Sequence, residues 1–182
     1  MKNKWLTIII VIILVALGGW WFVREVQERI PAVADQSTAY PELGRDHIPV
    51  GAEHPPYNSN PPSSGWHYAE TAKLGFYAVD EPSPADENLI HNIEHGEIWI
   101  AYRPTIPEPI QEALKQFAAE SLVIITPRSA NDTDIALVAW GRVDKWDLEP
   151  AGALDEQRIR DFITRWRNRG PEKVSPAVHQ SR

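Results

Sequence analysis

The sequence predicts an α+β or α/β domain of two layers, with a sheet of about four strands and several helices, preceded by one N-terminal transmembrane helix. Short apolar runs that alternate with amphipathic segments predict the mixed fold class. The charge-free apolar stretch at residues 5–23 predicts the transmembrane helix. A hydrophobic fraction of 43% in 182 residues is that of an ordinary globular protein with one domain.

The predicted elements follow the order strand, helix, strand, helix, strand, strand, helix. They are expected at residues 75–79, 84–95, 97–102, 107–119, 122–126, 135–140 and 155–169.

Local signals justify these elements in turn. Ser83 predicts an N-cap with Pro84 at the first helical position, and Gly96 can end that helix in the left-handed conformation. The runs at 122–126 and 135–140 read as buried strands, and Asn131 between them predicts a hairpin turn. The two later helices carry apolar stripes at helical spacing. The stripe residues are Ile110, Leu114 and Phe117, then Ile159, Phe162, Ile163 and Trp166.

The N-terminus predicts the compartment and the domain boundaries. Lysines precede the stretch at 5–23, and aromatic residues at its end are typical of a membrane interface, which favours an uncleaved anchor in the lipid bilayer. The predicted protein is therefore single-pass in the cell membrane with an extracytoplasmic C-terminal domain. The expected divisions are an anchor at 1–29, a linker at 30–46, a globular domain at 47–171 and a flexible tail at 172–182.

Composition excludes several classes of function. The chain has no cysteine and a net charge of −7. Disulfides, thiolate nucleophiles and iron–sulfur clusters are therefore excluded, and a nucleic-acid partner is not expected. No organic cofactor is predicted, and the identity of a protein partner is left open. Any metal ion must be held by histidine, carboxylate, tyrosine or backbone oxygen.

Histidines gather in one part of the chain. Five of the six fall within forty-nine residues, three of them in a proline-rich segment at 47–68 that cannot form a long helix. His91 and His95 are four residues apart and project from one face of the predicted helix, with Glu94 beside them.

This pattern predicts a transition-metal site. Two histidines at this spacing commonly bind one divalent ion, and His67 is the first candidate for a third ligand, after a turn-forming run. Glu94 is expected as a fourth ligand or as a partner of the ligands, and His47 and His54 are weaker candidates. Imidazole ligands without sulfur suit a Zn or Cu ion.

Two alternatives stay open. His91, Glu94 and His95 match the H-x-x-E-H spacing of inverted zinc peptidases, in which the glutamate is the general base, so a metal-dependent hydrolase that uses Glu94 is one alternative. The other is a non-metal protein-interaction module in which buried, hydrogen-bonded histidines form a structural network and the proline-rich loop presents aromatic side chains to a partner.

Two longer patterns carry a resemblance. The run 60–67 (Asn-Pro-Pro-Ser-Ser-Gly-Trp-His) and the run 91–96 (His-Asn-Ile-Glu-His-Gly), which leads into Ile-Trp-Ile-Ala-Tyr-Arg-Pro, resemble the domain-of-unknown-function 3105 family over roughly residues 47–171. The resemblance implies one N-terminal membrane segment with a single outer domain, and no assigned activity. The family pattern carries over to His47, Pro62, Ser64, Gly65, His67, His91, Glu94, His95 and Gly96.

Overall fold

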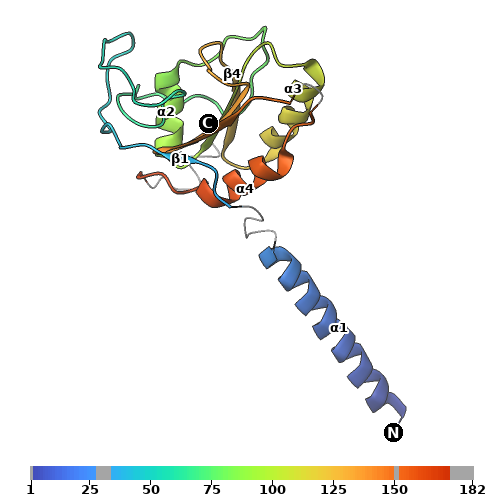
Figure 1. Ribbon diagram of the computed structural model, residues 1–182. Coiled ribbons are helices and arrows are strands. Elements are labelled where there is room, and N and C mark those ends of the chain that lie inside the picture. Colours follow the sequence, from blue (N-terminus) through green and yellow to red (C-terminus); the bar gives the residue numbers. More distant parts are fainter. Residues whose placement is uncertain (1, 28–33, 150–151, 173–182) are drawn as a thin grey trace.

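The computed structural model describes residues 2–27, 34–149 and 152–172, so residues 30–33 of the predicted linker and 173–182 of the predicted tail lie outside the described residues. The element order is helix, two short strands, helix, strand, two helices, three strands, helix (Figure 1). The bounds are α1 Lys2–Gln27, β1 Thr38–Ala39, β2 Gly75–Phe76, α2 Asp86–Glu94, β3 Ile98–Tyr102, α3 Glu108–Lys115, the 3₁₀ helix η1 Gln116–Ala119, β4 Val123–Pro127, β5 Ile135–Ala139, β6 Arg142–Trp146 and α4 Glu156–Trp166.

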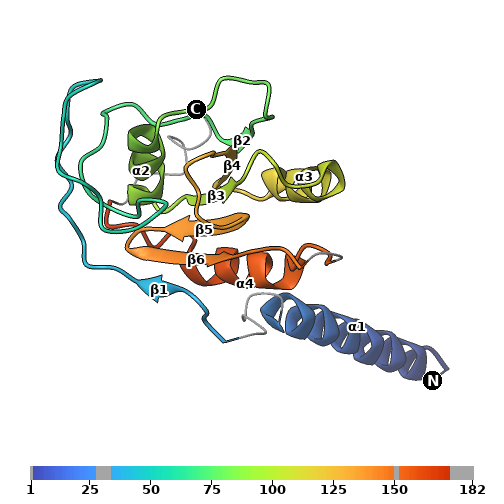
Figure 2. The same cartoon turned by 45° about the horizontal axis from the view of Figure 1, so that its top comes forward.

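The sheet is mixed and has six strands in the order β1-β6-β5-β3-β4-β2, which Figure 2 shows from the bottom of the view to the top. β2, β4 and β3 run parallel to one another, whereas β5 is antiparallel to both β3 and β6. The prediction of a four-stranded sheet is therefore wrong. The predicted hairpin at Asn131 is also absent, because β3 lies between β4 and β5; the hairpin joins β5 to β6 instead.

Both missed strands have a physical explanation. In β6, Arg142, Asp144 and Lys145 interrupt the apolar pattern that marks a strand. Asp144 is nevertheless buried, because the guanidinium of Arg158 on α4 donates from Nε to its carboxylate over 2.9 Å. β1 is only two residues long and pairs with β6 at the edge of the sheet, so it leaves no periodic signal.

Both faces of the sheet are covered, so the domain has three layers rather than the predicted two. On one face, Ile98, Ile100 and Ile125 pack against side chains of α3, η1 and α4. On the other, Trp99 and Ile124 pack against Leu89 and Ile93 of α2. Figure 1 shows α2 and α3 on opposite sides of the strands. Near-continuous apolar strands are expected when helices cover both faces.

The ends of α2 differ in how well the sequence predicts them. Ala85, without a side-chain hydrogen bond, occupies the N-cap position predicted for Ser83. Gly96 follows the helix with a φ of +87°, as predicted for a left-handed stop. A Cβ at Gly96 would lie 2.8 Å from the Cα of Asn168, so this turn also accommodates the close approach of the segment after α4.

The predicted transmembrane anchor lies in helix α1, and this prediction must be corrected. No helix in the described part of the chain is both long and apolar enough to cross a membrane. This finding overturns the transmembrane helix predicted at residues 5–23 and the single-pass, cell-membrane localisation predicted from it.

Candidate metal centre

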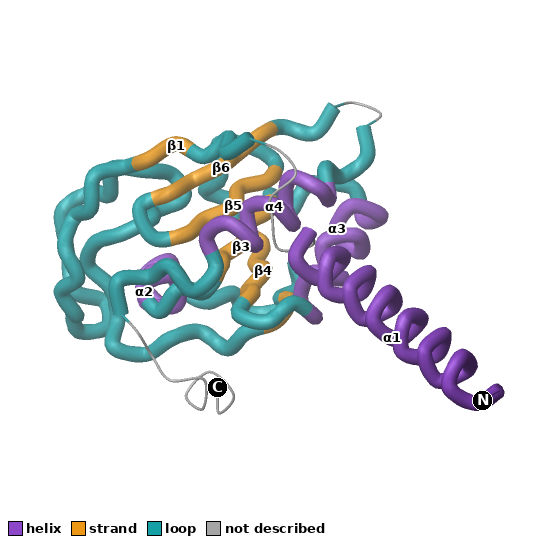
Figure 3. The backbone as a smooth tube through the Cα atoms, turned by 90° about the horizontal axis from the view of Figure 1, so that it is seen from below, coloured by secondary structure: helices purple, strands orange, loops and turns teal. Residues whose placement is uncertain are grey.

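The buried C-terminal half of α2 carries the central side chains of the site. His91, Asn92, Glu94 and the following His95 are all buried. Asn92 fixes the helix against the preceding segment, because its amide donates to the carbonyl of Ala72 and its oxygen accepts from the Ala72 N–H, each at 2.9 Å. These two hydrogen bonds fix the position of α2 relative to the segment that contains Ala72. Figure 3 shows loop segments surrounding α2 at this end of the molecule.

The proline-rich loop places His67 against α2. Gly65 has a φ of +120°, and a Cβ there would lie 3.3 Å from atoms of Leu43 and Tyr57, so glycine permits both the turn and the close packing. The hydroxyl of Tyr57 donates to the carbonyl of Trp66 over 2.7 Å. These contacts fix the backbone on the N-terminal side of His67, whose ring is fully buried.

An isolated parallel β-bridge brings His47 beside His67. The Ile48 N–H donates to the His67 carbonyl over 2.8 Å, and the His67 N–H donates to the Asp46 carbonyl over 3.2 Å. His47 is exposed, whereas His67 and the α2 residues are buried. The site therefore reaches solvent at His47.

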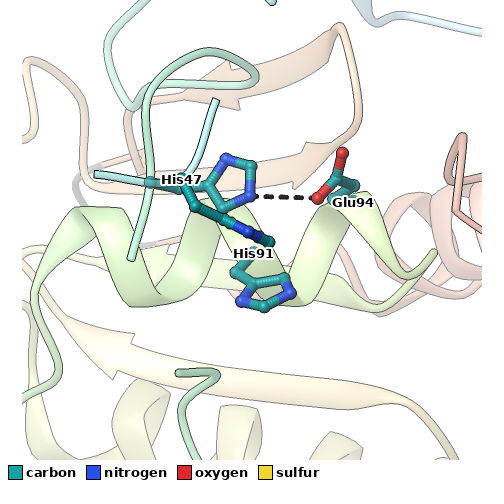
Figure 4. A group of neighbouring side chains, drawn as sticks. His47, His91 and Glu94 are labelled. Carbon is teal, nitrogen blue, oxygen red and sulfur yellow. Dashed lines mark ion pairs between the residues drawn. The ribbon is translucent and has the colours of Figure 1, made fainter. Parts of the chain in front are cut away.

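Within the described residues, four side chains converge into one group, His47, His67, His91 and Glu94, which we call the inner group. One ligand atom from each lies within 4.8 Å of all the others. The ring centroids are 4.7 Å apart for His47 and His67, 4.9 Å for His47 and His91, and 5.0 Å for His67 and His91. Figure 4 shows His47, His91 and Glu94 close together at α2. This group can hold a metal ion.

The hydrogen bonds of His67 set the character of the inner group. Its Nδ1 lies 2.8 Å from the Gly65 carbonyl, which can only accept, so Nδ1 carries the proton. In a neutral ring, Nε2 then carries a lone pair and no proton. It lies 3.0 Å from Oε2 of Glu94, yet it has no partner in hydrogen-bonding geometry. In that form two electron-rich atoms face each other in a buried position, an arrangement that a cation between them would stabilise.

His91 is held in its neutral form. Burial, followed by the neighbouring His95, His67 and His47, lowers the pKa of His91 to about 3. Its Nδ1 is buried without a hydrogen-bond partner. Neutral imidazole is the form that binds metal ions. Burial raises the pKa of Glu94, and the nearby His67 opposes this shift.

His95 belongs to a second group, with His91 and Glu172, which we call the outer group. The rings of His91 and His95 are 4.5 Å apart, and Nε2 of His95 lies 3.6 Å from Oε2 of Glu172. The outer group can also hold a metal ion. Glu172 was missed by the sequence analysis, because a single acid in a polar tail gives no local signal.

The structure thus separates the candidates predicted from sequence. His67, His91 and Glu94 lie together in the inner group, and His47, a weaker candidate, joins them. His91 and His95, the predicted pair, lie together in the outer group, whereas the inner group includes His91 but not His95. His54 is elsewhere: its ring stacks on Trp66 with 5.8 Å between centroids, and its Nε2 lies 3.3 Å from Oε1 of Glu87.

Comparison with known proteins places the chain in a family. A family model described as protein of unknown function (DUF3105) matches residues 50–179. No curated protein and no solved structure matches the chain. The matched region includes the loop of His67 and the whole of α2, so it contains every residue of the two groups except His47. The resemblance found in the sequence is confirmed, and the chain belongs to the DUF3105 family of proteins of unknown function.

Proposed function

We propose that this domain binds one divalent transition-metal ion, Zn(II) or Cu(II), through the inner group of His47, His67, His91 and Glu94. The observation that carries the proposal is the approach of His67 Nε2 to the Glu94 carboxylate at 3.0 Å without hydrogen-bonding geometry. A bound cation would satisfy both atoms. The neutral His91, with an unpartnered Nδ1 beside them, supplies a further lone pair.

The donor set supports the choice of metal. Three imidazoles and one carboxylate offer nitrogen and oxygen without sulfur, a set that suits Zn(II) and Cu(II) and is poorly matched to Mg²⁺ or Ca²⁺, which prefer oxygen ligands. Four protein ligands fill the tetrahedral shell of a structural zinc site. We therefore infer a binding site rather than a hydrolytic one, because Glu94 is used as a ligand and is not available as the general base of the hydrolase alternative.

Equilibrium titration of the full chain tests this proposal. The chain is produced without a histidine tag, stripped with a chelator and titrated with Zn²⁺ or Cu²⁺ in competition with a chromophoric chelator. We expect one equivalent of metal in the unmodified chain. His91→Ala and His47→Ala should lower the affinity by at least about 100-fold and about tenfold respectively, because loss of a ligand costs at least as much as loss of a residue that only supports one, which is about 10–100-fold.

Two controls make the titration decisive. His54→Ala removes a histidine that belongs to neither group, so it should leave the affinity unchanged. His47 is exposed, so His47→Ala should fold normally, as circular dichroism will check. Absence of uptake by the unmodified chain, or the same affinity in the His47, His54 and His91 variants, would refute the proposal and favour a structural histidine network.

A further inference from the structure

The inner and outer groups share one side chain, His91. The backbone of Tyr68 hydrogen-bonds its ring. Nδ1 is the nitrogen that remains buried without a partner. The ring nitrogen that donates to the backbone of Tyr68 carries a proton and has no lone pair, so only Nδ1 can bind an ion and His91 binds one ion at a time. The two groups therefore compete for His91.

Backbone hydrogen bonds hold the residues of the outer group in place. The Glu172 N–H donates to the carbonyl of Glu94 over 3.1 Å, and the Asn168 N–H donates to the carbonyl of Gly96 over 2.8 Å. These bonds attach the segment after α4 to the end of α2. They hold the Glu172 carboxylate next to His95, whose ring is almost fully buried.

We propose that His95 and Glu172 provide an alternative position for the ion, with His91 as the common ligand, so that the ion occupies either the inner or the outer group. This inference rests on the metal binding proposed above and describes how the ion moves within the same centre. The outer group holds the exposed carboxylate, since the side chain of Glu172 is 50% exposed and that of Glu94 only 4%.

The charges near the inner group and the outer group differ in sign. Near His47, the half-exposed guanidinium of Arg45 has its Nε 3.9 Å from Oε1 of Glu94. A fixed positive charge there opposes the approach of a divalent cation, whereas the exposed Glu172 carboxylate attracts it. These charges favour a first contact of the ion with the exposed Glu172 carboxylate, although the inner group also reaches solvent at His47.

A double-mutant comparison in the full, untagged chain tests the alternative position with Zn²⁺ as the probe. In the unmodified chain, where the inner group is complete, Glu172→Gln should change the zinc affinity by less than about twofold. His47→Ala/Glu94→Gln removes two inner ligands and leaves the outer group intact. In that background the ion should depend on the outer group, and Glu172→Gln should lower the affinity by about tenfold or more.

The controls separate the possible results. Glu108→Gln, an exposed glutamate on α3 across the sheet, should have no effect in either background. If His47→Ala/Glu94→Gln fails to fold, His47→Ala alone serves as the background, with the same expected difference. An equal effect of Glu172→Gln in both backgrounds, or two equivalents of zinc in the unmodified chain, would overturn the alternative position. Absence of zinc uptake by the unmodified chain would instead refute the proposed function.

Discussion

At the scale of single residues, the candidate centre is marked by two buried imidazole nitrogens without a hydrogen-bond partner, Nε2 of His67 and Nδ1 of His91. His67 donates from Nδ1 to the Gly65 carbonyl and turns Nε2 toward Glu94. His91 is kept neutral by burial and by its histidine neighbours. A buried polar atom without a partner is costly in a folded protein, so such atoms call for an explanation. The cation proposed above would satisfy both atoms.

The pKa of His91 predicts how the metal-free protein responds to acid. It falls from its ordinary value of 6.5 to about 3 in the folded chain. Between these values the unfolded chain binds the additional proton, so the free energy of unfolding decreases as the pH falls from about 6.5 toward 3. We expect His91→Gln to show a shallower decrease over this window.

Urea denaturation of metal-free protein at stepped pH measures this difference. The comparison with His91→Gln removes the contribution of carboxylates, which titrate in both chains. Above pH 6.5 the slopes of the two chains should agree. Parallel curves through the whole window would contradict the assignment of a lowered pKa to His91.

At the scale of elements, the end of α2 and the segment after α4 form one packed unit. A Cβ on Gly170 would lie 2.1 Å from the carbonyl oxygen of Glu94. Gly170→Ala must therefore displace the segment that carries Glu172. We expect it to lower the free energy of unfolding by at least about 2 kcal/mol, in the range of overpacked sites.

Chemical denaturation of Gly170→Ala checks this expectation, with Gly19→Ala as the control. Gly19 lies in α1, where a Cβ would meet nothing within 4 Å, so alanine there should be neutral or slightly stabilising. Unchanged stability in Gly170→Ala would mean that the segment is not packed against α2 as described.

The elements also show how much of the fold can be predicted from sequence. β3, β4 and β5 are continuous apolar runs, and their predicted bounds differ from the observed ones by one residue at most at each end. β6 could not be predicted, because charged residues interrupt its apolar pattern and Asp144 is buried through its pairing with Arg158 on α4. Tertiary pairing of this kind has no local pattern.

The same reasoning applies to the site. The spacing of His91 and Glu94 on α2 is local, so the sequence shows it directly. His47 reaches them through a β-bridge to His67, twenty residues away in an aperiodic loop. Glu172 arrives from beyond α4. Contacts between distant, irregular segments cannot be derived from periodicity.

At the scale of the whole molecule, metal binding should appear as stability. The residues of the inner group come from three segments. His47 lies in the segment after β1, His67 in the proline-rich loop, and His91 and Glu94 in α2. An ion that joins them favours the folded chain over the unfolded one. Zinc at 100 times its dissociation constant should raise the free energy of unfolding by about 2.7 kcal/mol.

Thermal unfolding with and without zinc tests this linkage. The melting temperature of the unmodified chain and of His54→Ala should rise with zinc, while that of His91→Ala should not. If His91→Ala loses the same stability in the presence and absence of zinc, the role of His91 is structural packing and not metal binding.

X-ray absorption spectroscopy at the zinc edge of the zinc-loaded full chain tests the central claim most directly. The account predicts a first shell of nitrogen and oxygen at about 2.0–2.1 Å, with the multiple-scattering signature of three imidazoles, and the loss of one imidazole in His47→Ala. A spectrum with no imidazole contribution, or one that His47→Ala leaves unchanged, would contradict binding at His47, His67, His91 and Glu94.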